Sequence, residues 1–125
     1  MKAKTIASGS KGNCAIVLSE HTNIIIDAGI SYLTLKKSLE ENSLSFDDFS
    51  GILITHCHKD HINGLSSIVK KTDLKVFIPE KMYDSLKEYL PIYKCIFIED
   101  NFNINDLSIE LIHTSHDAPS SVGYI

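Results

Sequence analysis

Seven consecutive residues, 55–61, constrain this chain more than any other segment. They read Thr-His-Cys-His-Lys-Asp-His, and four of them are His or Asp, which are residue types that bind metal ions. The apolar segment 51–54, Gly-Ile-Leu-Ile, comes directly before them and is typical of a buried strand. A buried strand that ends in imidazole and carboxylate groups places these groups at the rim of a sheet. The segment therefore predicts a sheet-containing protein with a metal site at the end of one strand.

The spacing within this segment indicates two adjacent metal positions. Residues two apart in an extended chain point to the same side, so His56 and His58 can bind one ion while Cys57 points away. Asp60 and His61 follow where the chain turns into a helix, so they reach a slightly different point. Imidazole and carboxylate ligands suit Zn²⁺, and also Mn²⁺ or Fe. The alternative is a histidine-rich surface loop, but four ligand-type residues in six positions favour the metal site.

The hydrophobic pattern predicts an α/β protein in which helices cover a sheet. Strand-like segments come first, and strand–helix units follow, as in layered α/β folds. Residues 99–106 are rich in Asn and Asp and are expected to form a turn. Strands are predicted at residues 2–8, 14–18, 23–26, 51–55, 75–78, 95–98 and 107–114, and helices at residues 32–41, 61–71 and 80–89. Ser31 is the expected N-cap of the first helix, and Asp60 could cap the second as well as bind metal.

Composition and charge narrow the possible functions. A chain of 125 residues with 43% hydrophobic and 22% charged residues predicts one globular domain, residues 1–125. The net charge of −4 argues against a broad basic face for nucleic acid, but it is compatible with a nuclease that holds phosphate through metal ions. The N-terminus lacks a signal-peptide pattern, no segment approaches the roughly 20 apolar residues that span a bilayer, and the three cysteines lack a disulfide spacing. We therefore expect a cytoplasmic protein that has no membrane partner.

Four motifs in chain order resemble those of the metallo-β-lactamase superfamily. Residues 55–61 contain its His-x-His-x-Asp-His signature, and residues 25–29, Ile-Ile-Asp-Ala-Gly, resemble its first motif, a strand that ends in Asp. Residues 115–118, Ser-His-Asp-Ala, followed by 122–124, resemble its third motif. Residues 7–14, Ala-Ser-Gly-Ser-Lys-Gly-Asn-Cys, are similar to the opening of the YycJ/WalJ-like branch. The resemblance implies a cytoplasmic hydrolase of a branch associated with exonuclease action on DNA.

The resemblance implies a dinuclear metal site with two zinc ions. In the superfamily, the aspartate at the position of Asp60 is a ligand that also orients the nucleophilic water, so Asp60 is the expected catalytic residue. The implied ligands are His56, His58 and His116 for the first ion, and Asp60 and His61 for the second. A further Asp and a further His of the family would lie beyond the third motif. We therefore expect the second ion's ligand set to be incomplete in this chain.

Other polar residues are expected to support the metal ligands or to lie near the substrate. Asp27, at the end of a strand, is expected to orient a ligand histidine or its loop by hydrogen bonds. The turn that spans residues 8–13 could present backbone N–H groups to a phosphate, although such turns are also common as solvated loops. Asp117 has either a substrate or metal contact or a structural role. The residues expected near the substrate are Ser10, Lys11, Asn13 and Asp117.

The fold implied by the resemblance is an αβ/βα sandwich made of two similar halves. This chain would supply the N-terminal half and the first strands of the second half, as one metallo-β-lactamase-like domain truncated at its C-terminus. A sheet without its full partner would expose an apolar face, which favours self-association.

The expected function is metal-dependent hydrolysis of phosphodiesters, in the manner of a DNA exonuclease. A bound metal ion lowers the pKa of water from 15.7 to roughly 7, which makes hydroxide available at neutral pH. Two alternatives stay open, because a fold does not fix a function. The chain could hydrolyse a thioester or lactone on the same scaffold, or it could bind metal as a half-domain without catalysis. Little activity is expected from the 125 residues alone.

Overall fold

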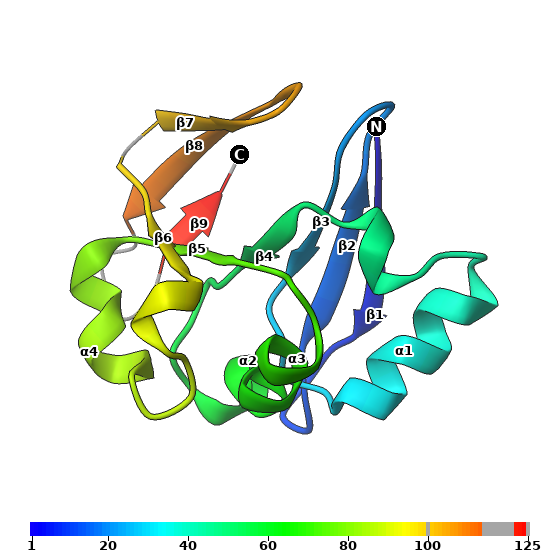
Figure 1. Ribbon diagram of the computed structural model, residues 1–125, viewed down its shortest axis with the longest axis horizontal. Helices are drawn as coiled ribbons and strands as arrows, with labels where there is room; N and C mark the ends of the chain where they lie inside the picture. Colours follow the sequence, from blue (N-terminus) through cyan, green and yellow to red (C-terminus); the bar gives the residue numbers. More distant parts are fainter. Residues whose placement is uncertain (100, 114–121, 125) are drawn as a thin grey trace.

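A computed structural model describes residues 1–99, 101–113 and 122–124 and shows two sheets with helices on one side (Figure 1). The larger sheet has six strands in the order in which they occur in the chain. Its first three strands are antiparallel, and the strands from β3 onward run parallel to one another. The six strands are β1 (Lys2–Ala7), β2 (Cys14–Leu18), β3 (Asn23–Ile26), β4 (Gly51–Leu53), β5 (Val76–Ile78) and β6 (Cys95–Phe97).

Strand β3 lies in the middle of the molecule and is buried on both faces of the sheet. Ile25 packs into the core on the helix side, whereas Ile24 packs into a second cluster on the opposite side. Both side chains are at most 3% exposed. The run of three β-branched residues predicts such a strand, since side chains on both faces contact other apolar groups. The predicted strand at 23–26 is confirmed with the same bounds.

Four α-helices and three short 3-10 turns connect the described strands. The helices are α1 (Tyr32–Glu41), α2 (Lys59–Ile62), α3 (Leu65–Lys71) and α4 (Tyr83–Leu86). The 3-10 turns are η1 (Phe46–Asp48), η2 (Glu80–Met82) and η3 (Ile92–Lys94). The first helix has the predicted bounds, and its predicted N-cap is confirmed, because the Thr34 backbone N–H donates to Ser31 Oγ at 3.1 Å. The third predicted helix, residues 80–89, is replaced by the shorter pair η2 and α4.

The single helix predicted for residues 61–71 is wrong, because the chain forms α2 and α3 with a break at Gly64. At this break the backbone meets the loop after β3, and Gly64 N donates to Ala28 O at 2.8 Å. A Cβ atom on Gly64 would lie 1.7 Å from Ile30 O, so only glycine allows this approach. The predicted N-cap role of Asp60 is also wrong. Helix α2 begins at Lys59, with His58 in the cap position.

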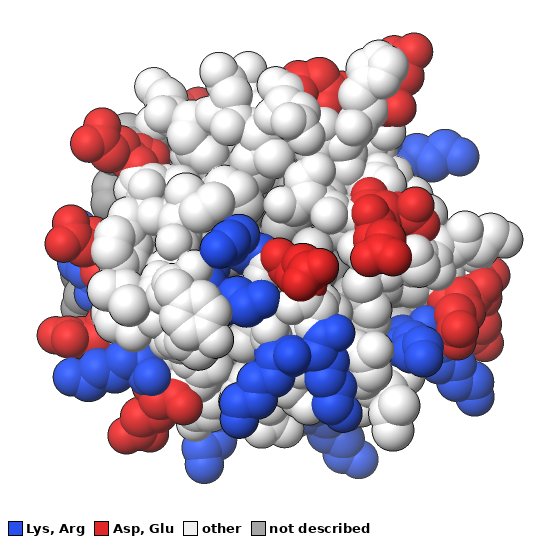
Figure 2. All heavy atoms as spheres, viewed as in Figure 1, with Lys and Arg blue, Asp and Glu red and all other residues white. Residues whose placement is uncertain are grey.

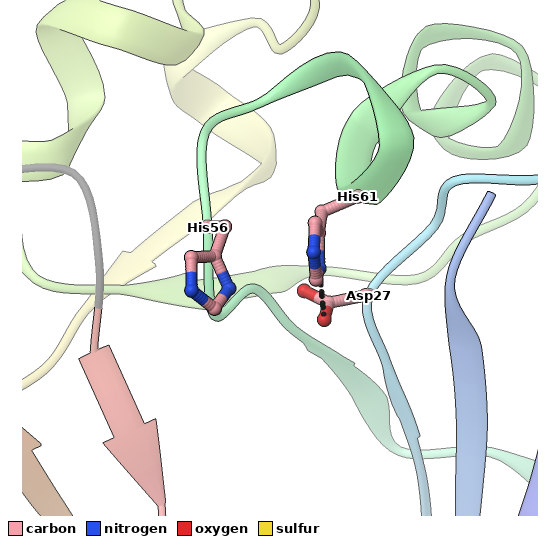
Figure 3. A group of neighbouring side chains, drawn as sticks. All are labelled: Asp27, His56 and His61. Atoms are coloured by element: carbon pink, nitrogen blue, oxygen red, sulfur yellow. Dashed lines mark hydrogen bonds and ion pairs between the residues drawn. The ribbon is translucent and has the colours of Figure 1, made fainter. Parts of the chain in front are cut away.

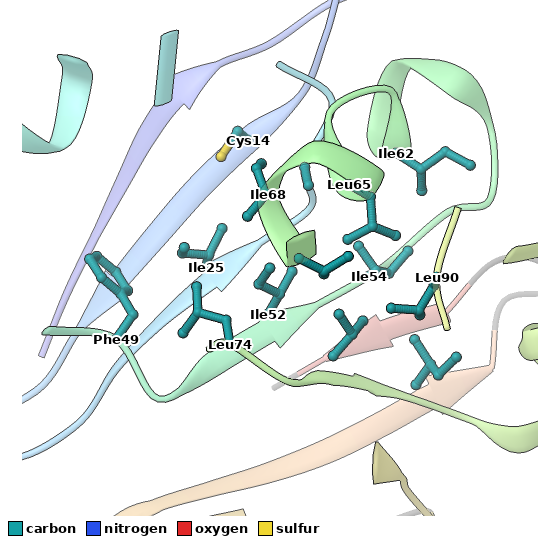
Figure 4. Close-up of a cluster of buried hydrophobic side chains, with 14 of the residues drawn as sticks. Cys14, Ile25, Phe49, Ile52, Ile54, Ile62, Leu65, Ile68, Leu74 and Leu90 are labelled. Atoms are coloured by element: carbon teal, nitrogen blue, oxygen red, sulfur yellow. The ribbon is translucent and has the colours of Figure 1, made fainter. Parts of the chain in front are cut away.

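The main core lies between the helices and the six-stranded sheet. Figure 4 shows α3 with Leu65 and Ile68 directed at Ile25 and Ile52 of the sheet and at Ile54, which follows β4. All five side chains are fully buried. Burying one such aliphatic side chain contributes about 1.5–3 kcal/mol, so this interface fixes α3 over the sheet. The opposite face of the helical layer is solvated and basic.

That basic surface is formed by lysines on α1 and α3. Lys36 and Lys37 on α1 and Lys70 and Lys71 on α3 are all exposed. Figure 2 shows that lysines gather over the lower part of this view, where Figure 1 places these helices. The positive charge is therefore local in a chain whose net charge is −4.

A second, three-stranded sheet packs on the face of the large sheet that the helices leave open (Figure 1). Its antiparallel strands are β7 (Asn101–Ile104), β8 (Leu107–His113) and β9 (Val122–Tyr124). Ile104 and Ile109 bury themselves against Ile24 and Leu53. The second sheet therefore covers part of the face that the large sheet presents away from its helices.

The turn predicted for residues 99–106 is wrong over half of its length, since β7 occupies Asn101–Ile104. Within β7, Phe102 and Ile104 face inward while Asn101 and Asn103 are exposed. This alternation, paired with β8, outweighs the turn preference of asparagine. The actual turn is at Asn105, which has a φ of +51°. Within the described ranges, no helix has the length and apolar character needed to cross a membrane.

Candidate metal centre

The candidate site lies where β3 and β4 end, at the same edge of the parallel part of the sheet. Asp27 follows β3, and Thr55 and His56 follow β4. Figure 3 shows the side chains of Asp27, His56 and His61 directed toward one another, with His61 projecting from α2. Their ligand-type atoms all lie within 4.8 Å of one another. Parallel strands thus bring together residues that lie up to 34 positions apart in the chain.

The Asp27 carboxylate connects Thr55 and His61 by hydrogen bonds. It is 5% exposed, and both of its carboxylate oxygens accept hydrogen bonds. Oδ1 accepts from the Thr55 backbone N–H at 2.7 Å, and Oδ2 accepts from Thr55 Oγ1 at 2.6 Å and from His61 Nδ1 at 2.7 Å. Because these bonds occupy the carboxylate, Asp27 is suited to orient ligands rather than to bind an ion itself. This is the geometry that its predicted supporting role requires.

The backbone of Asp27 is as unusual as its side chain. Its φ is +64°, which lies in the left-handed region that few residues other than glycine and the Asx pair adopt. The Asp27 N–H donates to Leu53 O at 2.7 Å, so this conformation is held from the β4 side. The turn redirects the chain at the end of β3 and points the carboxylate back toward Thr55 and His61.

Thr55 and Asp27 hold the Nδ1 atoms of His56 and His61. Thr55 Oγ1 donates its only hydrogen to Asp27, so its 2.9 Å contact with His56 Nδ1 is a bond that it accepts from His56. His61 Nδ1 likewise donates to Asp27. For His61 this bond leaves Nε2 as the ring nitrogen that can act as a metal ligand. The donor chemistry of this site therefore fits a zinc-type ion.

Asp60 and His61 converge on one point from the same short helix. Asp60 Oδ2 lies 3.6 Å from His61 Nε2. The side chain of Asp60 is 32% exposed and that of His61 17%, so the pair faces solvent at the mouth of the site. A carboxylate oxygen and an imidazole nitrogen this close can share one ion, as predicted for the second metal position.

The two described histidines predicted for the first ion, His56 and His58, lie farther apart than Asp60 and His61. The ring of His56 lies 6.2 Å from that of His58 and 4.4 Å from that of His61, measured between centroids. His58 is exposed and lies outside the group whose donor atoms fall within 4.8 Å. His116, the third predicted ligand, and Asp117 lie outside the described residues. The ligand assignments to the two ions therefore stay predictions.

The residues expected near the substrate separate into two kinds. Ser10 and Lys11 are exposed at the tip of the turn after β1. Asn13, at the end of the same turn, instead faces the metal loop, where its Nδ2 donates to Asp60 Oδ2 at 3.1 Å. Ser10 and Lys11 are thus placed to meet solvent or substrate, whereas Asn13 contacts a candidate ligand.

Two features of the site were not signalled by the motif pattern. Thr55 joins Asp27 to both histidine-bearing segments, although only its place between the strand and the first histidine could have suggested this. Gly29 lies where the three loops meet, and a Cβ on it would stand 1.9 Å from Asp60 O. Its backbone N–H donates to Asn13 O at 2.9 Å. Both residues fix where the ligand-bearing loops cross.

Cys57 is not arranged as a ligand or a nucleophile. It is half-buried and packs against the helix-side core. Burial is the main cause that raises the pKa of its thiol to about 11, opposed by a hydrogen bond with Ser85 and assisted by the charge of Asp27. At neutral pH the thiol is protonated and weakly nucleophilic. This packing agrees with the expectation that Cys57 points away from the metal ligands.

The mixed sheet, the helices on one face and the histidine–aspartate loops at its edge define the class as the metallo-β-lactamase superfamily. The chain belongs to the family described as "Anti-Pycsar protein Apyc1", whose pattern matches residues 3–90. The superfamily and the YycJ/WalJ-like branch predicted from the four motifs are confirmed by the relatives described next.

Relatives of the chain include bacterial nucleases. It is 34% identical over 124 residues to "Exodeoxyribonuclease YycJ" of Bacillus anthracis, a match that covers 95% of this chain and 47% of that protein. It is 32% identical to "Exodeoxyribonuclease WalJ" of Streptococcus pneumoniae serotype 2 (strain D39 / NCTC 7466), covering 94% of this chain and 46% of that protein. The chain therefore spans about half the length of these relatives.

Solved structures confirm the predicted fold class. One is the "First B3 Metallo-beta-Lactamase with an Active Site Glutamic Acid", which superposes with a TM-score of 0.80 at 15% identity and covers 98% of this chain and 53% of that chain. The BLEG-1 B3 metallo-β-lactamase superposes with a TM-score of 0.75 at 21% identity and covers 98% and 66% of the two chains. At these identities the likeness establishes the fold alone.

Proposed function

We propose that this chain carries the main ligand loop of a metal-dependent phosphodiesterase that acts on DNA. The observation that carries the proposal is the convergence of His61 Nε2 and Asp60 Oδ2, 3.6 Å apart, with His61 Nδ1 held by Asp27. The phosphodiester substrate is supported by the two relatives named exodeoxyribonucleases. Zinc is the ion that we propose, since the donors are imidazole and carboxylate groups.

The described residues divide into ligands and supports. Asp60 and His61 would hold the second ion, and His56, His58 and His116 would hold the first. When bound, such ions supply a nucleophile from water at neutral pH and stabilise negative charge on the phosphate. Asp27 keeps His61 in the tautomer whose Nε2 faces the ion, through the 2.7 Å bond to Nδ1.

Asp60 would have a second task besides binding metal. Its carboxylate lies at the mouth of the site and is one-third exposed, so an attacking water can reach it. There Asp60 orients the water in line with the phosphorus atom while the bond to the leaving sugar oxygen breaks. Lys11, exposed on the neighbouring turn, would attract the anionic backbone of the substrate.

Hydrolysis of a labelled linear DNA duplex by the purified chain with Mn²⁺ or Zn²⁺ tests this function. We expect slow, metal-dependent release of nucleotides that is lost in His58→Ala. His58 is exposed, so this change should leave the free energy of unfolding unaltered. The matched control is His21→Ala, which removes an exposed histidine from the turn between β2 and β3 and should retain the activity.

The other outcomes separate the remaining functions of this scaffold. Turnover of a thioester or lactone without turnover of DNA would contradict the phosphodiesterase proposal and favour a different hydrolase. Metal binding without turnover of any substrate would favour a metal-binding half-domain. DNA hydrolysis that persists in His58→Ala would mean that the reaction does not depend on His58 as a metal ligand, which would contradict the proposal.

A further inference from the structure

Asn13 was expected near the substrate, but it donates three hydrogen bonds to Asp60 in the candidate metal loop. Its backbone N–H donates to Asp60 O at 2.6 Å. Its side-chain Nδ2 donates to Asp60 O at 3.2 Å and to Asp60 Oδ2 at 3.1 Å. Asn13, in the turn after β1, thus hydrogen-bonds both the backbone and the carboxylate of Asp60, a proposed ligand 47 positions away in the chain.

The orientation of the Asn13 amide is fixed by its own turn. Gly9 N–H, which can only donate, points at Asn13 Oδ1 at 3.1 Å, and Nδ2 donates back to Gly9 O at 2.9 Å. The amide cannot flip without facing a donor with a donor. Its second Nδ2 hydrogen is therefore directed at Asp60.

This bond determines which lone pair of Asp60 is left for an ion. Oδ2 is the same oxygen that lies 3.6 Å from His61 Nε2. When Asn13 Nδ2 takes one lone pair of Oδ2, the other can bind an ion that His61 Nε2 also reaches. The carboxylate of a partly exposed aspartate would otherwise sample several rotamers, at a cost in side-chain entropy when it binds metal.

We propose that Asn13 is a positioning residue that presets the Asp60 carboxylate for metal binding through the Nδ2–Oδ2 hydrogen bond. This inference rests on the proposed function only in taking Asp60 as a ligand. Asn13 itself need touch neither metal nor substrate. It acts on Asp60 as Asp27 acts on His61, so each ligand of the pair has its own polar support.

The test is a double-mutant cycle read out as zinc affinity, determined by competition with a chromophoric chelator. Four chains are compared: the unchanged chain, Asn13→Ala, Asp60→Ala and the double variant. We expect Asn13→Ala to weaken zinc binding about 10-fold or more, the range typical of residues that support a ligand. In the Asp60→Ala background the same change should have no further effect.

The matched control is Asn23→Ala. The side-chain Nδ2 of Asn23 also joins two segments, by donating to Asp48 O at 3.0 Å, but it lies at the other end of β3. Its removal should leave zinc affinity unchanged. The free energy of unfolding of every metal-free variant separates loss of fold from loss of positioning.

Two results would overturn the positioning role of Asn13. One is unchanged zinc affinity in Asn13→Ala. The other is an equal loss of affinity in the presence and absence of Asp60, which would mean that Asn13 acts through the loop as a whole. The proposed function fails in a different way, namely if Asp60→Ala alone binds zinc as tightly as the unchanged chain.

Discussion

The site loops and the second sheet are attached to the large sheet in different ways. The loops are joined to one another by short backbone hydrogen bonds, such as Asn13 N to Asp60 O at 2.6 Å and Ala28 N to His61 O at 2.8 Å. The second sheet rests on apolar contacts, in which Ile104 and Ile109 are buried, and its polar contacts are made by the β7–β8 turn.

This difference indicates which part of the molecule is preformed. Directional backbone bonds allow little adjustment, so the loops fix the ligand positions before any ion binds. A small apolar cluster tolerates shifts and opens at a lower cost than the main core. We therefore expect changes in the loops to affect the whole chain, and changes in the second sheet to remain local.

The largest effect is expected from Gly29→Ala, at the point where the loops cross. The added Cβ would stand 1.9 Å from Asp60 O and 2.5 Å from Asn13 N, so the backbone of at least one loop must move. Such overpacking should cost about 3 kcal/mol or more. Urea unfolding measures this cost. The comparison is Gly9→Ala, where no atom lies within 4 Å and only the φ of +108° opposes the change, at about 1 kcal/mol. If Gly29→Ala and Gly9→Ala lower the free energy of unfolding equally, the loops at Gly29 are not closely packed.

Asp27→Ala should have the next largest effect. It leaves the Thr55 N–H and His61 Nδ1–H without their acceptor in a site where Asp27 is 5% exposed. Loss of hydrogen bonds to a buried charge costs about 2 kcal/mol, and loss of support for His61 should weaken zinc binding about 10-fold. Urea unfolding without metal and zinc titration separate the two effects. The exposed Asp47→Ala serves as the control, and a weaker zinc affinity in that variant would contradict the assignment.

The sequence predicted the parts of this fold that depend on local pattern. The isoleucine run of β3 and the cap at Ser31 were placed correctly, because burial on both faces and a side-chain cap leave clear signatures. The break at Gly64 and the strand at Asn101–Ile104 were not. The break depends on a loop distant in the chain, at Ala28, and the strand depends on its pairing with the next strand, β8.

The same limit applies to the site. The cluster of ligand types in 55–61 was evident from spacing, and Asp27 from its place at the end of a strand. The role of Thr55 and the contact of Asn13 with Asp60 were not, since they depend on how three loops cross in space. A motif identifies which chemistry is present, whereas the supporting bonds follow from topology.

A change in the apolar cluster of the second sheet tests whether this sheet opens separately. Ile109 is 6% exposed and packs against Leu53, so Ile109→Val should cost about 1 kcal/mol. Hydrogen exchange should become faster in β7 and β8 but not in β3 and β4. The matched change Ile52→Val, in the fully buried main core, should accelerate exchange throughout the described sheets. If Ile109→Val accelerates exchange in β3 and β4 equally, the two sheets open as one unit.

The smallest effect concerns the turn of the second sheet, where Asp106 accepts hydrogen bonds from Thr22 Oγ1 and from Ser19 Oγ. The bond from Thr22 is the main cause that lowers the pKa of the Asp106 carboxyl below its ordinary value of 3.8. Because the pKa is lower in the folded chain, the ionised carboxylate stabilises the fold above about pH 4. That contribution is lost as the pH falls through the folded-state pKa.

Asp106→Asn should therefore lower the thermal midpoint slightly at pH 6, and the difference from the unchanged chain should shrink toward pH 3. Asp106 is fully exposed, so solvent screening keeps the effect small. Thermal unfolding at several pH values measures it, with Asp47→Asn as an exposed control that should show no such trend. A difference that stays constant with pH would mean that the charge of Asp106 does not stabilise the turn. The turn would then be fixed by its hydrogen-bond geometry, as the site loops are, and the second sheet would differ less from the site loops than we infer.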